Sequence, residues 1–308
     1  MNGCTFSVKP TLINMPTPHT VYVIAGPTAV GKTAAAIRLA QRLQVPIVSA
    51  DSRQCYTELG IGVAKPSAEE LQAVPHYFIN SHSIHEEMNA GLYEQYALNV
   101  VTTLLQQFGS VVMVGGTGLY VKAFCDGIDA MPAIDAAIRE QLLQQYQLEG
   151  LPWLQQQIQQ LDPAFWAVAE QQNPQRLLRA LEVVTATGQS ITQFRVQQKQ
   201  IRPFAIQKIG LELPRTQLYE RINQRVVNMV ASGLVAEAEQ LYTYKHLNAL
   251  QTVGYKELFD YFDGHCNLPQ AIEQIQINTR HYAKRQMTWF KKDPDVVWQH
   301  PEQAIVCS

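Results

Sequence analysis

The sequence predicts an α/β fold in which a parallel sheet is flanked by helices and interrupted by an all-helical lobe. Apolar runs of strand length alternate with helical patterns up to about residue 124, and the alternation returns after residue 203. This alternation is typical of a right-handed parallel sheet. Residues 125–203 differ, because they are rich in Gln, Leu and Ala, have helical periodicity and contain no strand-like run. They indicate a helical insertion.

The composition excludes several classes of protein. The chain has 308 residues, 46% hydrophobic and 16% charged, enough for one large core with an added lobe. The net charge of −2 provides no overall positive field, so a nucleic acid would have to be met by local basic patches. The five cysteines include no C-x-x-C pair, which argues against a zinc finger and suits a reducing cytosol. The longest apolar runs have strand length, so we expect neither a membrane span nor a secretory signal.

A glycine-rich stretch follows the first predicted strand, Val21 to Ala25, and leads into a helical run at residues 34–40. It fits the pattern G-x-x-x-x-G-K-[ST] in the strand–loop–helix context that a phosphate-binding loop requires. Its residues are Gly26, Pro27, Thr28, Ala29, Val30, Gly31, Lys32 and Thr33. The glycines let backbone N–H groups turn inward, Lys32 carries a positive charge to the phosphates, and the Thr33 hydroxyl suits Mg²⁺. We therefore expect a P-loop-containing sheet with a diphosphate or nucleotide site.

Polar residues follow the second predicted strand, Val45 to Ala50. They are Asp51, Ser52, Arg53 and Gln54. Side chains just past the carboxyl end of a parallel strand face the ligand crevice, which would put Asp51 beside the phosphate-binding loop. Asp is equally common as a cap of a helix or turn, and the position alone leaves both interpretations open.

A second glycine-rich turn, residues 115–120, closes the predicted strand Val111 to Val114. A third strand at His76 to Asn80 and a helix at Tyr93 to Phe108 precede it. The Thr117 hydroxyl in this turn either reaches a phosphate or substrate, or the glycines only let a helix approach the sheet. No acidic residue ends the strand, which makes an ATP-hydrolysing motor a poor fit.

The helical insertion contains one paired set of arginines. Its predicted breaks lie near Pro132, residues 150–152, Pro163 and residues 173–174. A helix begins at Pro174 and carries Arg176 and Arg179 on one face. These arginines either grip a phosphate backbone or are solvated and paired with Glu182, and the spacing favours the second interpretation.

The last third of the chain combines arginines with a basic aromatic helix. After a strand at residues 205–213, a helix from Tyr219 to Val227 carries Arg221 and Arg225, a pair that can clamp a leaving diphosphate. Residues 251–256 are interpreted as a glycine turn. The helix expected at residues 268–292 interleaves basic and aromatic side chains: Arg280, His281, Tyr282, Lys284, Arg285, Trp289, Lys291 and Lys292. This pattern fits either an RNA contact or a basic helix end, and a final strand follows at residues 296–298.

Six of these stretches together resemble the bacterial tRNA dimethylallyltransferases, from about Val21 to Trp298 and in the same order. They are residues 26–33, 49–54, 115–120, 173–183, 253–256 and 283–290. The resemblance implies transfer of a dimethylallyl group from dimethylallyl diphosphate, with Mg²⁺ as cofactor and diphosphate as product. The acceptor would be the exocyclic N6 amine of the adenosine 3′-adjacent to the anticodon, in tRNAs that read codons beginning with U.

The same resemblance implies a role for individual residues. Asp51 would be the general base, Thr28, Lys32 and Thr33 would hold diphosphate and Mg²⁺, and Thr117 and Arg225 would assist at the reacting centre and the leaving group. The residues that would touch tRNA are Asp51, Ser52, Arg53, Gln54, Thr117, Arg139, Gln175, Arg176, Leu177, Leu178, Arg179, Gln251, Thr252, Val253, Gly254, Tyr255 and Lys256.

The expected organisation follows from these assignments. A flexible tail at residues 1–18 precedes a core at 19–124, a tRNA-binding helical insertion at 125–203 and a second core segment at 204–308. We expect a cytoplasmic monomer. Two alternatives remain open: a P-loop nucleotide kinase, which shares the strand–loop–helix opening, and an adenylate dimethylallyltransferase acting on a free nucleotide. The insertion and the basic helix favour a macromolecular acceptor.

Overall fold

The computed structural model describes residues 19–196 and 198–305, so the predicted tail at residues 1–18 lies outside the described residues. The described chain separates into two compact units. The second unit is Asp126–Ile201, and the first combines the chain on either side of it. Within the second unit, the backbone N–H of Gln200 donates to the carbonyl of Asp126 at 2.7 Å. The two ends of this unit therefore lie next to each other.

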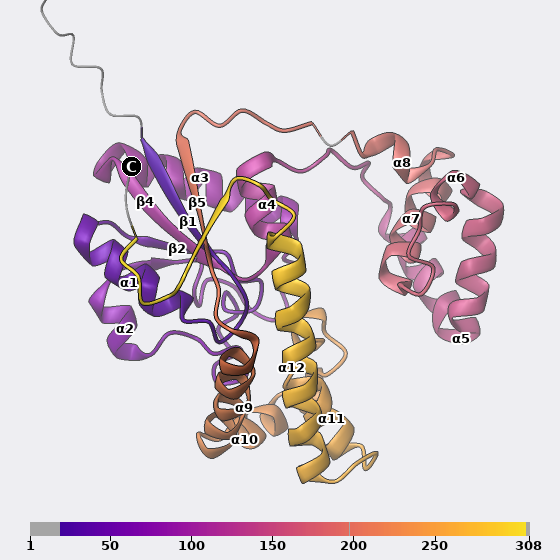
Figure 1. The fold of residues 1–308 in the computed structure, drawn as a ribbon. Helices are drawn as coiled ribbons and strands as arrows, with labels where there is room; N and C mark the ends of the chain where they lie inside the picture. The colour runs from indigo at the N-terminus through magenta and orange to yellow at the C-terminus, as the bar shows by residue number, and fades with distance from the viewer. Residues whose placement is uncertain (1–18, 197, 306–308) are drawn as a thin grey trace, which may run out of the picture. The chain divides into compact units, whose positions relative to one another are not determined.

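In the described residues, the first unit is built around a six-stranded sheet whose order is β3-β2-β4-β1-β5-β6 (Figure 1). All neighbouring strands are parallel, as predicted. The strands are β1 (Thr20–Ala25), β2 (Ile47–Ser49), β3 (His76–Tyr77), β4 (Ser110–Gly115), β5 (Ala205–Leu211) and β6 (Val296–Gln299). The prediction of a strand as far as Asn80 is wrong, because Phe78 and Asn80 have positive φ angles of 62° and 51° and turn the chain away.

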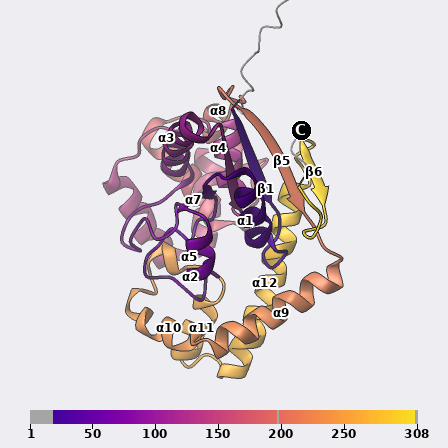
Figure 2. The same cartoon turned by 90° about the vertical axis from the view of Figure 1, so that its left-hand side faces the viewer.

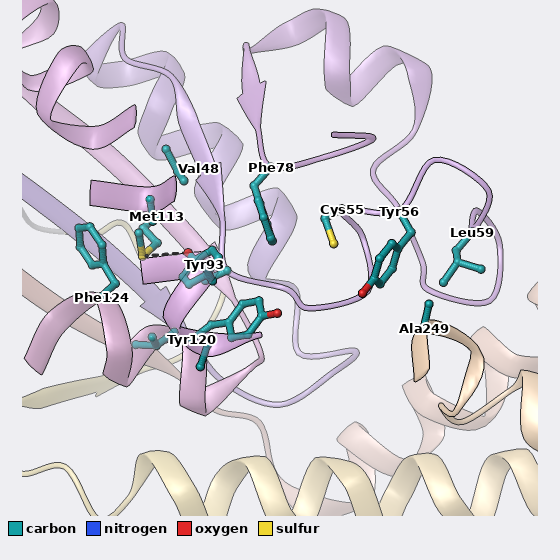
Figure 3. Packing of buried hydrophobic residues seen from close by; sticks show 14 of the residues in the cluster. Val48, Cys55, Tyr56, Leu59, Phe78, Tyr93, Met113, Tyr120, Phe124 and Ala249 are labelled. Carbon is teal, nitrogen blue, oxygen red and sulfur yellow. Dashed lines mark hydrogen bonds between the residues drawn. The ribbon is translucent and has the colours of Figure 1, made fainter. Parts of the chain in front are cut away.

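Successive side chains of β1 point to opposite faces of the sheet, and both faces are apolar. Val21 and Val23 pack in one core with α3 (Ala90–Phe108) and α4 (Gly118–Asp126), whereas Tyr22 and Ile24 pack in another with α1 (Lys32–Leu43). This is the two-residue period of a strand that is covered on both sides. In the first core, the ring of Tyr93 stacks on that of Tyr120 with centroids 4.3 Å apart (Figure 3).

The remaining helices of the first unit mostly gather beyond the edge at which the strands end (Figure 2). They are α2 (Ala68–Ala73), α9 (Arg215–Ala231), α10 (Leu234–Gln240), α11 (Tyr255–Phe262) and α12 (Leu268–Phe290), with short 3-10 turns at Tyr242–Tyr244 and Asn248–Leu250. The interpretation of residues 251–256 as a turn holds only to Gly254, whose φ of 102° directly precedes α11. Tyr255 and Lys256 are helical, because the carboxylate of Glu257 accepts the N–H of Gly254 and caps this start.

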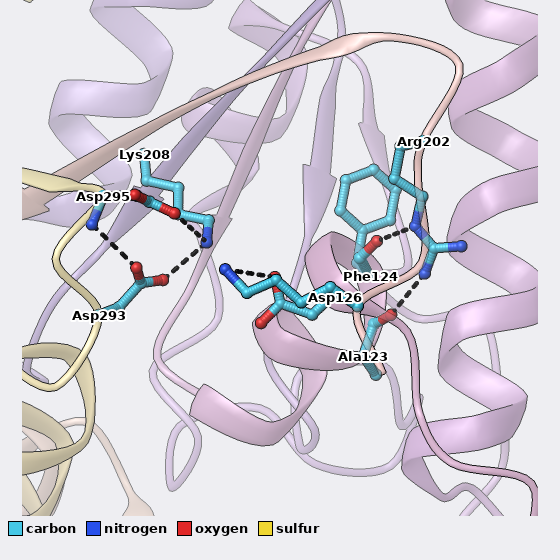
Figure 4. A network of polar contacts seen from close by, with 8 residues as sticks. Ala123, Phe124, Asp126, Arg202, Lys208, Asp293 and Asp295 are labelled. Carbon is cyan, nitrogen blue, oxygen red and sulfur yellow. Dashed lines mark hydrogen bonds and ion pairs between the residues drawn. The ribbon is translucent and has the colours of Figure 1, made fainter. Parts of the chain in front are cut away.

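Two cations with mostly covered side chains, Lys208 and Arg202, each join two segments of the first unit (Figure 4). Lys208 on β5 lies 2.7 Å from the carboxylate of Asp293, which comes just before β6. Arg202 donates to the carbonyls of Ala123 and Phe124, each at 2.8 Å, and so binds the end of α4. Each contact therefore links two segments that are at least 78 residues apart in the sequence.

In the described residues of the second unit, all regular secondary structure is helical. Its helices are α5 (Ala136–Leu161), α6 (Pro163–Trp166), α7 (Pro174–Thr187) and α8 (Ile191–Phe194). Gly150 interrupts α5 with φ 75° and ψ −165°, as the predicted break indicates. Asn173 caps α7 with Pro174 in its first turn. Leu154, Ile158 and Leu177 are fully buried in the core of this unit.

Candidate active site

The phosphate-binding loop joins β1 to α1 at the carboxyl edge of the sheet. Gly26 and Gly31 have φ angles of 147° and 103°, which favour glycine. A Cβ on Gly26 would also lie 2.7 Å from the carbonyl oxygen of Leu211, so β5 can approach only a glycine. Ala29 has a φ of 64°, a strained value for a residue with a side chain. The motif does not reveal this strain.

Lys32 is the cation of this loop. Its Nζ donates to the carbonyl of Pro27 at 2.8 Å. Burial lowers the pKa of Lys32 to about 8; the charge of Asp51 raises it and that of Arg225 lowers it. The ammonium is poorly solvated, so a bound anion would be favoured at this position.

Asp51 lies beside the phosphate-binding loop. It lines two cavities, a smaller one at that loop and a larger one next to it. Its Oδ1 accepts the backbone N–H of Arg53 at 2.9 Å and that of Gln54 at 3.4 Å. The two interpretations left open by the sequence therefore both apply, because the carboxylate caps a turn and also faces the crevice.

Thr117 lies beside this turn. Its Oγ1 accepts the N–H of Ser52 at 3.0 Å and donates to the Ser52 hydroxyl at 3.2 Å. The phenol of Tyr282 on α12 also reaches Thr117, and burial followed by the charge of Asp51 raises the pKa of Tyr282 to about 12. The phenol therefore remains protonated and can donate a hydrogen bond.

The glycines around Thr117 do let a helix approach. A Cβ on Gly118 would lie 2.3 Å from the Trp289 ring of α12, and one on Gly116 would lie 2.4 Å from Nε2 of Gln286. The approaching helix is α12, which comes about 170 residues later in the chain. The glycines therefore do let a helix approach the sheet, as one of the two interpretations of this turn holds. This does not exclude a polar role for Thr117.

Arg225 on α9 completes the cationic side of the site. Its Nη1 donates to Oγ1 of Thr28 at 3.2 Å, and burial lowers its pKa. Arg221, one turn earlier on α9, extends Nη1 to 3.8 Å from where a Cβ on Gly31 would lie. The predicted arginine pair thus flanks the phosphate-binding loop.

Two cavities open on this arrangement. The smaller, about 310 Å³, is lined by the phosphate-binding loop, Lys32, Thr33 and Glu70. The larger, about 720 Å³, is lined by polar groups that include Arg53, Lys256 and Arg285. The residues common to both are Thr28, Asp51, Val63, Ala64, Arg225 and Tyr282. An anion in the first cavity and a ligand in the second would meet at these side chains.

A loop at residues 60–66 forms one wall of both cavities, and the carboxylate of Glu237 on α10 holds it in place. Glu237 accepts the backbone N–H groups of Gly60, Ile61 and Gly62 at 3.1, 2.8 and 2.9 Å, and the Tyr255 hydroxyl at 2.6 Å. Gln54 adds hydrogen bonds to the carbonyls of Val63 and Ala64. Sequence reasoning missed this loop, because it follows no predicted strand and its anchor lies far away in the chain.

Most of the residues expected to touch tRNA from the first unit line the cavities. They are Asp51, Ser52, Arg53, Gln54, Gln251, Thr252, Val253, Gly254 and Lys256. Tyr255 is fully buried, and its hydroxyl bonds Glu237, so its side chain is occupied by the fold. Any contact with RNA at Tyr255 must come from its backbone.

Helix α12 presents a basic aromatic surface on its outer side. Arg280 is engaged with Asn223 and Lys291 with Glu212. The side chains around a surface hollow of about 410 Å³ are His281, Lys284, Arg285, Thr288, Trp289 and Lys292. Of the predicted aromatic groups, His281 and Trp289 lie at this hollow, whereas Tyr282 lines the two inner cavities.

In the second unit, the residues expected to touch tRNA include two that bind one buried acid. Arg179 lies 3.0 Å and Arg139 3.4 Å from the carboxylate of Glu182. The pairing of Arg179 with Glu182 that the spacing favoured is confirmed, and Arg176 lies 3.1 Å from Glu170. Leu177 is fully buried, so only its backbone can touch a ligand; Gln175 is exposed, and Leu178 is partly exposed.

Two further observations limit the kinds of site present. No group of three or more His, Cys, Asp or Glu side chains in the described part of the chain could hold a metal ion. Within residues 19–196 and 198–305, no helix is both long enough and apolar enough to cross a bilayer.

Fold and site together define a P-loop protein in which the phosphate-binding loop and a larger cavity share polar side chains, a layout that suits a group-transfer enzyme. The chain belongs to the IPP transferase family, whose sequence profile matches residues 54–293.

Individual relatives agree with this assignment. The chain is 47% identical over 284 residues to tRNA dimethylallyltransferase 1 of Bacteroides thetaiotaomicron, covering 92% of each protein. It is 46% identical over 287 residues to the protein of the same name from Bacteroides fragilis, covering 93% of this chain and 95% of the relative. Its fold matches the crystal structure of the tRNA isopentenylpyrophosphate transferase of Bacillus halodurans with a TM-score of 0.67 and 36% identity, covering 91% and 89% of the two chains.

Proposed function

We propose that this protein transfers a dimethylallyl group from dimethylallyl diphosphate to the N6 amine of the adenosine 3′-adjacent to the anticodon, in tRNAs reading codons that begin with U. The C–O bond between the allyl carbon and the diphosphate breaks, and a C–N bond forms. The amine loses one proton, and diphosphate leaves. Family membership and the names of the relatives support a prenyl-transferring enzyme. The roles of Thr28, Lys32, Thr33, Asp51 and Arg225 are those that the resemblance implies, and the geometry of the two cavities supports them.

The observation that carries the proposal is that the two cavities share Thr28, Asp51, Arg225 and Tyr282. The smaller cavity offers N–H groups and Lys32 to a diphosphate. The larger has room for a base that has left its stack and polar groups to hold it. The reacting carbon and nitrogen would meet at the shared residues.

On the donor side, the chemistry is mainly stabilisation of the departing diphosphate. Lys32 and Arg225 provide positive charge, and the hydroxyl of Thr28 is fixed by Arg225. The smaller cavity also has oxygen donors from Thr33 and Glu70, which fit Mg²⁺ because this ion takes few protein ligands and uses substrate phosphates. When bound there, Mg²⁺ would neutralise charge on the diphosphate.

On the acceptor side, Asp51 would take the proton of the amine. An aromatic amine is a weak nucleophile, so removal of its proton as the C–N bond forms lowers the barrier. Because Oδ1 already accepts two backbone N–H groups, we assign the proton to Oδ2. Tyr282, still protonated, would orient the base by donating a hydrogen bond.

The RNA would be held by the polar rim of the larger cavity and the basic outer face of α12. Gln251 to Gly254, Lys256 and Arg285 form part of that rim. Arg139 and residues 175–179 are proposed contacts from the second unit. Because tRNA is the proposed acceptor, we propose the cytoplasm as the site of action, and a monomer as the active form.

The test is mass spectrometry of tRNA nucleosides after incubation with dimethylallyl diphosphate and Mg²⁺. The expected product is N6-dimethylallyladenosine, formed only when the donor is present. Competition by an anticodon stem-loop, and none by AMP, is expected for a tRNA enzyme. Transfer to AMP, or phosphate transfer from ATP to a nucleoside with tRNA unmodified, would instead support one of the two alternatives from the sequence.

A further inference from the structure

Gln286 is a buried amide on α12 that joins the two glycine-rich turns. Only 6% of the residue is exposed. Its Oε1 accepts the backbone N–H of Thr28 at 2.8 Å, and its Nε2 donates to the carbonyl of Gly116 at 2.8 Å. These partners lie 258 and 170 residues away in the sequence. A single side chain therefore connects the loop after β1 with the turn after β4.

The peptide that Gln286 binds also holds Lys32. The N–H of Thr28 and the carbonyl of Pro27 belong to one planar peptide unit and point in opposite directions. Gln286 binds the N–H, and the ammonium of Lys32 donates to the carbonyl at 2.8 Å. Fixing one end of the plane orients the other, so the amide sets the direction in which the carbonyl meets Lys32.

The space around this amide is matched to it. A Cβ on Gly116 would lie 2.4 Å from Nε2 of Gln286 and 3.4 Å from Nζ of Lys32. The absence of a side chain at Gly116 thus leaves room for the amide beside the ammonium. A buried amide with both ends satisfied is rigid, because moving it would leave two polar groups unpaired.

The same helix reaches the reacting centre one turn earlier. Tyr282 lines both cavities, and Gln286 lines the smaller one. Residues four apart lie on one face of a helix, so α12 supports the acceptor side with Tyr282 and the donor side with Gln286.

We propose that Gln286 is a positioning residue of the phosphate-binding loop: it orients the Pro27–Thr28 peptide so that Lys32 is held in the diphosphate subsite before the ligand arrives. This inference rests on the proposed function for the identity of the ligand. It predicts that Gln286 governs diphosphate binding through the Pro27–Thr28 peptide, because both polar ends of its side chain are already engaged.

The test measures binding of inorganic pyrophosphate to purified variants by calorimetry, with no RNA present. Gln286→Met keeps the length of the side chain and removes both hydrogen bonds, and we expect about tenfold weaker binding. The matched control is Gln276→Met on the same helix, whose amide bonds the carbonyl of Asn223 instead. The control should bind pyrophosphate as wild type does, and thermal unfolding of each variant shows that it is folded.

Gln286→Glu separates positioning from simple packing. It keeps the shape of the side chain and an acceptor for the Thr28 N–H, but it puts a carboxylate oxygen where Nε2 donates to the Gly116 carbonyl. Binding at neutral pH should fall further than in Gln286→Met, because the carboxylate repels the ligand.

The proposal fails if folded Gln286→Met binds pyrophosphate like wild type. If Gln286→Met does not fold, Gln286→Glu decides, and an unchanged affinity for pyrophosphate overturns the proposal. Steady-state kinetics add a second criterion: KM for the diphosphate donor should rise while KM for tRNA stays constant, and an equal rise in both would overturn it. A protein that binds pyrophosphate as expected but modifies no tRNA would refute the proposed function and leave this inference standing.

Discussion

Replacing Asp51 by Asn should separate its chemical role from its structural one. The amide oxygen of Asn can still accept the N–H groups of Arg53 and Gln54, as Oδ1 of Asp51 does at 2.9 and 3.4 Å. The turn after β2 is therefore preserved, and only the charge and the ability to accept a proton are lost. Asp51→Ala removes the charge, the ability to accept a proton and the two hydrogen bonds of the turn, and it serves as the comparison.

The expected magnitudes follow from these contacts. A positioned general base contributes roughly 10²- to 10⁴-fold to a rate, so we expect Asp51→Asn to slow the chemical step by about 10³-fold. The two turn hydrogen bonds contribute about 1 kcal/mol each, so Asp51→Ala should be less stable than Asp51→Asn by about 1–2 kcal/mol. Binding of the anticodon stem-loop should be retained in Asp51→Asn.

The assay is single-turnover transfer to an anticodon stem-loop, with product measured by mass spectrometry. Because the charge of Asp51 raises the pKa of Lys32, its removal should lower that pKa below about 8. The reaction must therefore be run well below that pH with saturating donor, so that loss of the base is not mistaken for loss of diphosphate binding. A variant that transfers the dimethylallyl group at nearly the wild-type rate would refute the assignment of Asp51 as base.

Three further predictions concern the donor loop, the sheet and the cavity wall. Pyrophosphate binding by wild type should weaken as pH rises through about 8, where Lys32 loses its proton, and Lys32→Met should bind weakly at every pH; titration calorimetry measures both. Gly26→Ala should lower the free energy of unfolding by more than about 2 kcal/mol in urea, because its Cβ would lie 2.7 Å from the Leu211 carbonyl, whereas Gly91→Ala in α3 should not destabilise; equal effects would contradict this. Glu237→Gln should raise KM for tRNA about tenfold with kcat little changed, because one amide oxygen cannot accept all four donors and the loop at residues 60–66 is held less firmly. Glu239→Gln, at an exposed position, is the control, and an equal rise of KM in that variant would contradict the reasoning.

The parts of the site that the sequence predicts are those with local signals. The phosphate-binding loop and Asp51 each follow a recognisable strand, and parallel strands bring their carboxyl ends to one edge. The pairing of Arg179 with Glu182 could be predicted because residues three apart on a helix are neighbours.

The parts that could not be predicted depend on contacts between distant segments. Gln286 meets Thr28 across 258 residues, and Glu237 meets Ile61 across 176. No periodicity within α12 or α10 marks these side chains as different from other polar ones. The end of β3 was missed for a different reason, since Phe78 adopts a φ of 62° that its residue type disfavours.

The joined ends of the second unit have a consequence for evolution and engineering. The backbone of Gln200 bonds that of Asp126, and Arg202 binds carbonyls near the end of α4. The chain therefore leaves the first unit and returns to it at neighbouring points, as it would at a short hairpin. Because the entropic cost of closing a loop grows only slowly with its length, the length of the segment between these two points has little effect on the stability of the first unit. If the second unit contacts tRNA as proposed, grafting the corresponding helices of a relative at these two positions should leave pyrophosphate binding intact and change which tRNAs are modified.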